Sequence, residues 1–326
     1  MPNAIRIHQT GGPDVLKWEP VEVDEPGPGQ VRLRQHAAGL NFIDVYHRTG
    51  LYPQPLPFTP GVEGAGVVES VGPDVENVKA GDRVAYAGPI GSYAEVRLID
   101  ADRLVKLPDD IEFDQAAAMM LQGMTARMLL RAVFPVTKGD TILVHAAAGG
   151  VGLILCQWAA ALGATVIGAV STEEKAELAR AHGCAHPIIY GKQDFVAEVD
   201  RITDGAKLPV VYDSVGRDTF MKSLDCLRPR GLMVSFGQSS GPVEPFSPTI
   251  LAQKGSLYLT RPTLFHYIAS RAQLAQSAAD LFEVVGSGQV KIEVKQSFAL
   301  ADAAAAQRAL EARQTIGSTV LTIDPE

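Results

Sequence analysis

The sequence predicts an α/β protein with two domains, a β-rich, barrel-like domain and a doubly wound parallel sheet. The chain has 326 residues, about twice the usual length of one domain. Its first part carries short alternating apolar segments separated by turn signals such as Gly72-Pro73-Asp74. From Thr141 onward, apolar strands alternate with helical segments. The first pattern is typical of a β-barrel, and the second of a parallel sheet with helices on both faces.

Each element follows from local periodicity. In the β-rich part we expect strands at residues 4–7, 30–38, 64–71, 83–86 and 93–98. Residues 113–131 then show helical periodicity, and Pro135 and Gly139 close the connection.

The second part predicts a regular alternation. Strands are expected at residues 141–144, 164–170, 210–212, 232–235 and 256–259, with helices at 153–162, 173–181, 195–203 and 219–226. A helix at 271–287, a strand near Val294, a helix at 301–312 and a short strand at 318–323 follow. We expect a first domain of residues 1–124, completed by 265–326, and a second domain of 125–264.

A glycine turn between residues 141 and 170 carries the main functional signal. A buried strand is followed by Gly149, Gly150 and Gly152, and then by a helix that ends at Gly163. Ala147 occupies the first glycine position of a GxGxxG pattern. Such a turn aims backbone N–H groups and the positive helix dipole at a phosphate. It predicts a dinucleotide pyrophosphate site at Ala148, Gly149, Gly150, Val151 and Gly152, and the alternative is an ordinary strand-to-helix turn.

The end of the second strand indicates which nucleotide binds. An NAD site usually has a carboxylate there, but Val170 and Ser171 occupy the position. Ser171 and Lys175 supply a hydroxyl and a cation, which suit a 2′-phosphate, while Glu173 and Glu174 point to solvent in a helix first turn. We therefore predict NADPH as the cofactor. The alternative is that Lys175 is a solvated helix residue.

Composition limits the other function classes. The formal net charge is −8, with acidic and basic residues mixed along the chain, which argues against an obligatory nucleic-acid partner. No signal peptide or apolar run of membrane-spanning length is found, so we expect a cytoplasmic protein. Cys156, Cys184 and Cys226 form no CxxC pair or disulfide framework, and Cys156 is expected in the core.

Several stretches together indicate a family. They are AAGLNFIDVYHRTGLYP, PGVEGAGVVESVG, AGDRVAY, HAAAGGVGLILCQWAAALGA, VVYDSVG and LRPRGLMVSFGQSSG, in this order along the chain. The chain resembles the zinc-free NADPH:quinone oxidoreductase (zeta-crystallin-like) branch of the medium-chain dehydrogenase/reductase superfamily. The resemblance implies a GroES-like catalytic domain, a Rossmann nucleotide-binding domain and a cleft between them. It also implies a homodimer formed by pairing of sheet edges, with residues 256–259 as the edge strand.

The metal ligands of zinc-dependent relatives are replaced here. Asn41 stands where those relatives have a Cys, and Val62 in Gly61-Val62-Glu63 stands where they have a His. The Cys-rich lobe is absent as well, because no Cys precedes Cys156. Asn and Val do not supply the thiolate or imidazole ligands that zinc prefers, so we predict no metal.

The resemblance directs attention to a few residues for the chemistry. Asn41 is a candidate for a hydrogen bond to a substrate oxygen or to the cofactor amide, Tyr46 for the cofactor phosphates or the quinone, and Tyr52 for an aromatic wall. The alternatives are that Asn41 is a turn residue and that the two tyrosines are half-buried packing residues. Asp44 and Glu63 are either acid/base groups or orienting groups. We favour orientation, because a quinone that accepts a hydride can take its proton from water. His47 is expected to be a packed or surface histidine rather than a proton relay.

Further cofactor contacts follow from the ends of the strands and from the matched motifs. The remaining candidates, besides Asn41 and Tyr46, are Thr125, Tyr190, Ser214, Gly216, Arg217, Phe236, Gly237, Ser239, Arg261 and Arg313.

The predicted activity is hydride transfer from NADPH to a quinone without a metal. A quinone needs no Lewis acid, because its conjugated ring accepts hydride and delocalises the charge. One alternative is reduction of an α,β-unsaturated ketone or aldehyde. Another is a non-catalytic role, since relatives of this branch serve as lens proteins and some bind RNA, which the acidic balance disfavours.

Overall fold

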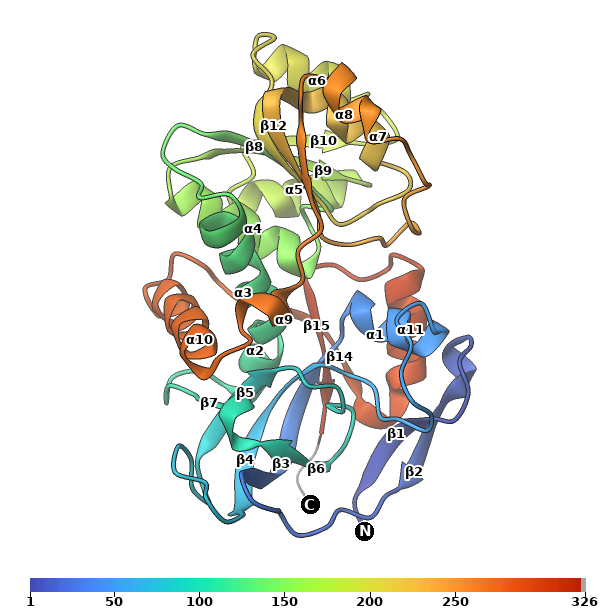
Figure 1. The fold of residues 1–326 in the computed structure, drawn as a ribbon, viewed down its shortest axis with the longest axis vertical. Coiled ribbons are helices and arrows are strands. Elements are labelled where there is room, and N and C mark those ends of the chain that lie inside the picture. Colours follow the sequence, from blue (N-terminus) through green and yellow to red (C-terminus); the bar gives the residue numbers. More distant parts are fainter. Residues whose placement is uncertain (324–326) are drawn as a thin grey trace. The chain divides into compact units, whose positions relative to one another are not determined.

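The computed structural model describes residues 1–323, and these form two compact units. The first unit contains Met1–Met124, Ile268–Phe282 and the chain from Ile292 onward. The second unit contains Thr125–Tyr267 and Glu283–Lys291. Figure 1 shows the elements of both units, coloured along the sequence from the N-terminus to the C-terminus.

A seven-stranded sheet forms the centre of the first unit. Its order is β14-β15-β3-β4-β5-β7, and β6 also pairs with β3. The strands are β3 (Gln30–Gly39), β4 (Glu63–Val71), β5 (Arg83–Ala87), β6 (Val96–Asp100), β7 (Val105–Lys106), β14 (Val294–Ala299) and β15 (Ser318–Thr322). All neighbours are antiparallel except β14 and β15, so the end of the chain completes a sheet that the first hundred residues begin.

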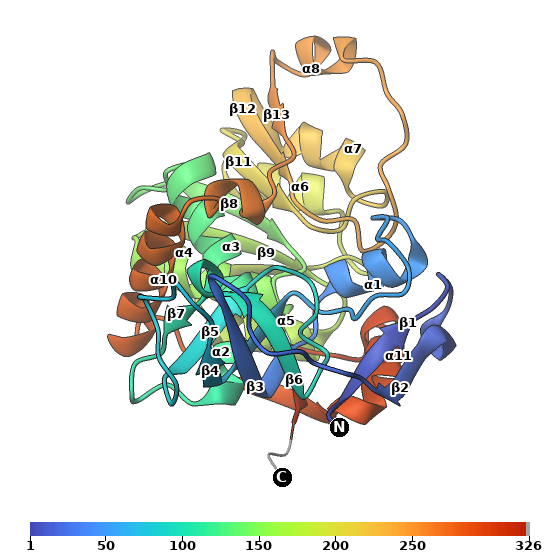
Figure 2. The ribbon, with the colours of Figure 1, turned by 60° about the horizontal axis from the view of Figure 1, so that its bottom comes forward.

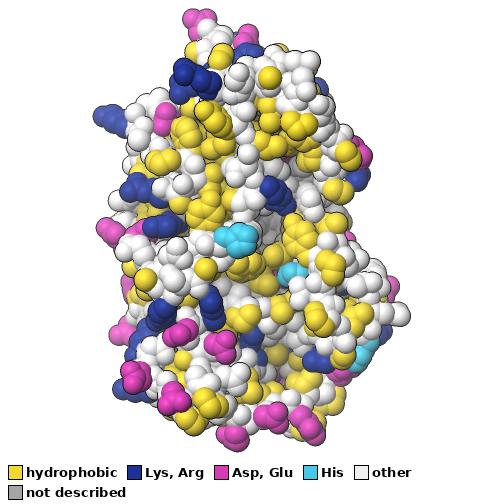
Figure 3. Space-filling model, viewed as in Figure 1, with side chains coloured by type: hydrophobic (Ala, Val, Ile, Leu, Met, Phe, Trp, Pro, Cys, Tyr) yellow, Lys and Arg dark blue, Asp and Glu magenta, His cyan; other side chains and the backbone are white. Residues whose placement is uncertain are grey.

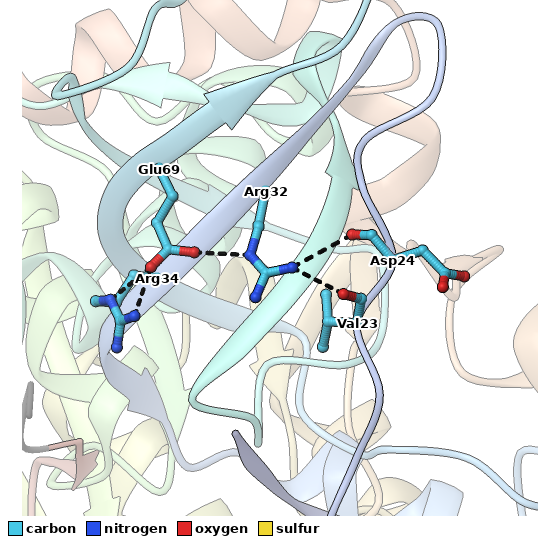
Figure 4. Close-up of polar contacts among 5 residues, drawn as sticks. All are labelled: Val23, Asp24, Arg32, Arg34 and Glu69. Atoms are coloured by element: carbon cyan, nitrogen blue, oxygen red, sulfur yellow. Dashed lines mark hydrogen bonds and ion pairs between the residues drawn. The ribbon is translucent and has the colours of Figure 1, made fainter. Parts of the chain in front are cut away.

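Alternation along β3 assigns its two faces. Val31 and Leu33 are fully buried in a core cluster that includes strand residues of β4, β5 and β6. Arg32 and Arg34 alternate with them along the strand and face the other side, where both contact Glu69 of β4 at 2.9 and 2.6 Å (Figure 4). Arg32 also donates to the carbonyl oxygen of Val23. The period of two therefore separates an apolar face from a charged face.

Smaller elements cover this sheet. The hairpin of β1 (Asn3–Ile7) and β2 (Leu16–Pro20) packs beside α11 (Ala303–Glu311), where Ile5, Leu16 and Ala306 share one core cluster (Figure 2). The other α-helices that lie wholly or partly in the first unit are α1 (Phe42–Thr49), α2 (Phe113–Ala117), α3 (Met120–Arg127) and α10 (Arg271–Gly286). The single helical segment expected at 113–131 is divided, because α2 ends before Met120 and a wider π-helical turn (Met128–Val133) follows α3.

The second unit is built on a six-stranded, fully parallel sheet. Its order is β10-β9-β8-β11-β12-β13, which is the 3-2-1-4-5-6 order of a doubly wound nucleotide-binding fold. The strands are β8 (Thr141–His145), β9 (Thr165–Val170), β10 (His186–Ile189), β11 (Leu208–Asp213), β12 (Leu227–Ser235) and β13 (Tyr258–Thr260). The helices are α4 (Gly150–Ala161), α5 (Glu173–Ala181), α6 (Phe195–Ile202), α7 (Phe220–Ser223), α8 (Thr249–Gln253) and α9 (Leu264–Tyr267). The predicted fold class is confirmed.

Several boundaries differ from the expected ones, and three of them have clear local reasons. The helix expected at 153 begins at Gly150, since the glycine turn itself forms the first helical turn. The edge strand expected at 256–259 runs from Tyr258 to Thr260, because Ser256 has a left-handed φ of 54°. The strand expected at 93–98 begins at Val96, and Ala94 forms only an isolated bridge.

The surface carries charges of both signs. Acidic and basic side chains both occur on the face drawn in Figure 3. Within residues 1–323, no helix is long and apolar enough to span a bilayer.

Candidate nucleotide and substrate sites

The glycine turn joins β8 to α4 and has the geometry of a phosphate cradle. Gly149 is the N-cap of α4 and no side chain caps this helix, so its first N–H groups are not occupied by a side-chain acceptor. A Cβ atom at Gly152 would lie 2.2 Å from the carbonyl oxygen of Ala146, which no side chain tolerates. The close approach of backbone to helix therefore requires glycine there, and the residues fit a bound pyrophosphate.

Ala147 departs from the glycine pattern, and its surroundings explain why this is tolerated. Ala147 is fully buried. A Cβ atom added to Gly168 of β9 would lie only 2.7 Å from the Cβ of Ala147. The methyl group of Ala147 thus occupies space that Gly168 leaves empty on the neighbouring strand. The first glycine of the pattern is replaced by a matched pair of small residues.

Ser171 and Tyr190 come together at the carboxyl end of the sheet. Ser171 directly follows β9, and the N–H of Tyr190 donates to the carbonyl oxygen of Val170 at 3.0 Å. Lys175 lies in the first turn of α5, where its N–H donates to the N-cap Thr172. Glu173 is exposed and pairs with Lys192 at 2.6 Å. The edge therefore carries hydroxyls and cations, and of the two glutamates in the first turn of α5, Glu173 is engaged with a lysine.

The loops after β11 and β12 interlock at the same sheet edge. The N–H of Ser239 donates to the carbonyl oxygen of Ser214 at 3.1 Å, and a Cβ on Gly237 would lie 2.6 Å from that oxygen. Gly216 has a φ of +89°, and the N–H of Arg217 donates to the carbonyl of Gly241. The fold thus brings together the predicted residues of both loops, including Phe236, which directly follows β12.

Besides Asn41 and Tyr46, which are described below, three predicted cofactor residues lie outside the strand-end loops. Arg261 follows β13 and donates to the carbonyl oxygen of Ser235 at 3.0 Å. Thr125 lies on α3 and is half-buried. Arg313 belongs to the first unit, where it is exposed and left-handed after α11.

Asp213 is a residue of this sheet edge that the sequence analysis missed. It ends β11 and is fully buried, and its Oδ1 accepts the N–H groups of Val215 and Gly216 at 2.8 and 3.0 Å. Its Oδ2 accepts the hydroxyl of Thr219 at 2.7 Å. Asp213 therefore shapes the loop that carries Ser214 and Gly216. An aspartate at the carboxyl end of an apolar strand was the available signal.

In the first unit, Asn41 lies at the start of α1 within a buried network. It is 8% exposed, and its Nδ2 donates to Oε2 of Glu63 at 2.7 Å. Its Oδ1 accepts from Nε2 of Gln122 at 3.1 Å, and the hydroxyl of Ser318 donates to Oε1 of Gln122. A donor and an acceptor therefore fix which way the Asn41 amide faces. Gln122 and Ser318 were not among the predicted residues.

Two buried carboxyl groups hold this region. Glu63 also accepts the N–H of Leu121 at 2.7 Å, yet burial raises its pKa to about 8. Asp44 accepts the N–H of Asn41 and the hydroxyl of Tyr93, at 2.9 and 2.8 Å. Burial likewise raises the pKa of Asp44 to about 7. Both groups contact backbone or positioned side chains, which is the arrangement of orienting groups.

Aromatic side chains follow Asn41 along α1. Tyr46 and Tyr52 lie edge to face with ring centroids 5.2 Å apart, and the N–H of Tyr52 donates to the carbonyl of Tyr46. His47 is buried, and burial lowers its pKa to about 4. His47 is therefore a packed histidine, as expected. Tyr46 is buried and Tyr52 is half-buried, so the two rings form one small aromatic pair.

Metal ligands are not gathered in the part of the chain that the structure describes. Val62 is buried, and no group of three or more His, Cys, Asp or Glu residues is placed to hold an ion within residues 1–323. Cys156, Cys184 and Cys226 are buried free thiols, which confirms Cys156 as a core residue.

Comparison with known proteins connects both units to one family. The alcohol dehydrogenase GroES-like domain family matches residues 27–109, and the zinc-binding dehydrogenase family matches residues 150–283. A quinone oxidoreductase of Pseudomonas aeruginosa is 54% identical over 98% of this chain and 99% of its own. The chain belongs to the quinone oxidoreductase family of the medium-chain dehydrogenase/reductase superfamily.

Other relatives show the range of this quinone oxidoreductase family. An Escherichia coli quinone oxidoreductase, solved in complex with NADPH, superposes with a TM-score of 0.97 at 48% identity and covers 98% of this chain and 100% of its own. A 2-haloacrylate reductase of a Burkholderia species is 49% identical over 97% of both chains. The relatives of this chain therefore include a reductase named for an activated alkene.

Proposed function

We propose that this protein transfers a hydride from NADPH to a quinone without a metal. The observation that carries the proposal is the uncapped glycine turn of α4 together with the sheet edge at Ser171, Lys175 and Tyr190. The E. coli relative solved with NADPH supports it at 48% identity. A hydroxyl and a cation at the strand end favour a 2′-phosphate over a free ribose hydroxyl.

The second unit is proposed to hold the cofactor and the first unit to carry the substrate site. Ala148, Gly149, Gly150, Val151 and Gly152 would bind the pyrophosphate, and Ser171, Lys175 and Tyr190 the 2′-phosphate. The remaining cofactor contacts would come from Asn41, Tyr46, Thr125, Ser214, Gly216, Arg217, Phe236, Gly237, Ser239, Arg261 and Arg313. When bound, NADPH supplies the hydride, and the protein supplies position and surroundings.

Asn41 is the residue that we expect to meet the quinone or the cofactor amide. Its amide has two N–H groups, and one of them is used by Glu63. Glu63 and Gln122 hold the amide so that the other N–H keeps a fixed direction. Tyr46 and Tyr52 would form the wall against which a flat ring packs. The hydride adds two electrons, and water delivers the proton that completes the hydroquinone.

We further propose a homodimer that forms through β13. Tyr258 and Leu259 of this edge strand are 61% and 38% exposed, and an unpaired strand edge is a template for a second copy. Leu259→Lys should convert the dimer to a monomer in light-scattering measurements. The three buried free thiols support a cytoplasmic location, where cysteines stay reduced.

The test is NADPH oxidation with 1,4-benzoquinone and 9,10-phenanthrenequinone, with NADH in parallel and EDTA present. Rapid turnover with NADPH and a quinone, unchanged by EDTA, is the expected result. Equal use of NADH would contradict the assignment of the 2′-phosphate site. Loss of activity with EDTA would contradict metal-free transfer.

Reduction of an activated alkene is the second candidate. The 49% identity to a 2-haloacrylate reductase favours it, because the same hydride can add to an electron-poor C=C bond. A 2-haloacrylate and an alkenal should therefore be assayed beside the quinones. Turnover confined to these acceptors would move the assignment to alkene reduction.

A further inference from the structure

A buried hydrogen-bonded chain lies behind Tyr190 in the second unit. The Tyr190 hydroxyl is 2.6 Å from Nδ1 of His145, and Nε2 of His145 is 2.8 Å from Oγ of Ser223. Ser223 Oγ is in turn 3.2 Å from Oδ2 of Asp213. His145 is 1% exposed, and Ser223 and Asp213 are fully buried. The chain thus leads from the sheet edge into the core.

The fold fixes the imidazole at the centre of this chain. His145 is the last residue of β8, directly before the glycine turn, whereas Tyr190 follows β10. The ring of His145 is parallel to that of Tyr190 within 2°, and Phe195 lies edge-on to it at 5.0 Å. Both imidazole nitrogens therefore have one polar partner each, and the ring is held in place by aromatic packing.

Neutral imidazole carries one N–H, so two arrangements of the chain are possible. Burial lowers the pKa of His145, which keeps the ring neutral. In the first arrangement, Nε2–H donates to Ser223 and Nδ1 accepts the hydroxyl hydrogen of Tyr190. In the second, the Ser223 hydroxyl donates to Nε2 and Nδ1–H donates to the Tyr190 oxygen. The second arrangement directs the hydroxyl hydrogen of Tyr190 away from His145.

Asp213 permits the second arrangement. Its carboxylate already accepts the N–H groups of Val215 and Gly216 and the hydroxyl of Thr219. It does not depend on the hydroxyl hydrogen of Ser223. The other acceptor of that hydroxyl, the Thr219 carbonyl oxygen at 2.9 Å, already accepts the N–H of Ser223. The Ser223 hydroxyl can therefore turn to His145. The change from one arrangement to the other moves only hydrogens.

We propose that His145, supported by Ser223, is a positioning residue that makes Tyr190 a hydrogen-bond donor to the 2′-phosphate and so sets the preference for NADPH over NADH. The inference rests on the proposed function, which places the 2′-phosphate beside Tyr190. An ionised phosphate only accepts hydrogen bonds, so it requires the second arrangement. The ribose 2′-hydroxyl of NADH both donates and accepts, and is compatible with either one.

Two substitutions separate the two nitrogens of His145. Asparagine places its amide where Nδ1 lies, toward Tyr190, and glutamine places its amide where Nε2 lies, toward Ser223. His145→Gln should raise the Kd for NADPH about tenfold, the loss expected for one hydrogen bond to a charged group, and leave the Kd for NADH within about twofold. His145→Asn should retain most of the NADPH affinity. Fluorescence titration of the purified protein with each nucleotide measures all four values.

Tyr190→Phe tests separately whether the 2′-phosphate lies at Tyr190 and whether His145 positions Tyr190. If the 2′-phosphate lies at Tyr190, this variant loses NADPH affinity selectively, and His145→Gln then adds nothing in the double variant. Selective loss in Tyr190→Phe without loss in His145→Gln overturns the role of His145 and leaves the phosphate site intact. Unchanged selectivity in Tyr190→Phe overturns both.

Ser223→Ala keeps the test falsifiable if the histidine variants fold poorly. It removes only a hydroxyl and should lower NADPH affinity several-fold with NADH affinity retained. Ser277→Ala, at a buried serine of α10 in the first unit, is the matched control and should change neither affinity. An equal loss for NADPH and NADH in the His145 or Ser223 variants would indicate a structural role only and would overturn the inference.

Discussion

Glu63→Gln tests the buried carboxyl at the start of β4 through the pH dependence of stability. Burial raises the pKa of Glu63 to about 8, against an ordinary value of 4.5, although Asn41 and Leu121 donate to it. Between those two values the folded protein holds a proton that the unfolded chain has released. Each unit of pH in this interval therefore lowers the free energy of unfolding by about 1.4 kcal/mol, and the whole interval by on the order of 5 kcal/mol.

The glutamine variant has no proton to lose, so its curve should be flatter. The substitution also has a cost. Glu63 accepts hydrogen bonds from Asn41 Nδ2 and from the N–H of Leu121. The NH2 group of a glutamine would face one of these two donors and could not accept its hydrogen bond. One lost hydrogen bond in the core costs about 1–3 kcal/mol. The variant should therefore be less stable than wild type near pH 5 and more stable above about pH 8, and the two curves should cross.

Urea unfolding followed by circular dichroism across this pH range measures both curves. Glu69→Gln is the control, because it makes the same exchange on the same strand at a half-buried side chain and should keep the wild-type slope. Parallel curves for wild type and Glu63→Gln would refute the reasoning, since they would mean that Glu63 is ionised in the folded protein throughout.

Three further changes test other parts of the structure. Gly152→Ala should reduce NADPH affinity by tenfold or more in the titration above, because its Cβ would meet the Ala146 carbonyl at 2.2 Å. Lys175→Ala should raise the KM for NADPH about tenfold, with little change for NADH, which steady-state kinetics with both cofactors would show. Leu33→Ala removes a fully buried side chain of β3 and should lower the free energy of unfolding by about 2–5 kcal/mol in urea titrations, with cofactor affinity retained.

Elements with strong local signals were predicted closely. Helix α5 spans Glu173–Ala181 as expected, because Thr172 caps it and its apolar positions keep a helical period. Strands β8 and β9 were also found, since buried parallel strands are runs of apolar and β-branched residues. The glycines between them identified the dinucleotide turn before any contact was known.

Two of the missed elements, α1 and β2, were missed for different reasons. Helix α1 has a capping signal, because Asp44 accepts the N–H of Asn41, but its residues were considered only as site candidates. Strand β2 is mostly exposed along LKWEP and exists through pairing with β1. The local pattern therefore had little to report for β2, whereas α1 carries a local helix signal that the sequence analysis did not use.

The same limit applied to the site. Gln122 contacts Asn41 from 81 residues away, and Ser223 contacts His145 from 78 residues away. Such pairs leave no trace in local spacing. Strand ends, by contrast, meet at one edge of a parallel sheet by topology, so Ser171 and Tyr190 could be proposed together.

The contacts of Glu63 bear on its role in the reaction. Both of its oxygens are used, Oε1 by the N–H of Leu121 and Oε2 by Asn41, and the side chain is fully buried. A proton leaving Glu63 toward a substrate at Asn41 would have to pass through an amide, which does not carry protons near neutral pH. A raised pKa therefore does not make Glu63 an acid catalyst here. Its geometry instead favours an orienting group that works through Asn41, in agreement with the proposed delivery of the proton by water.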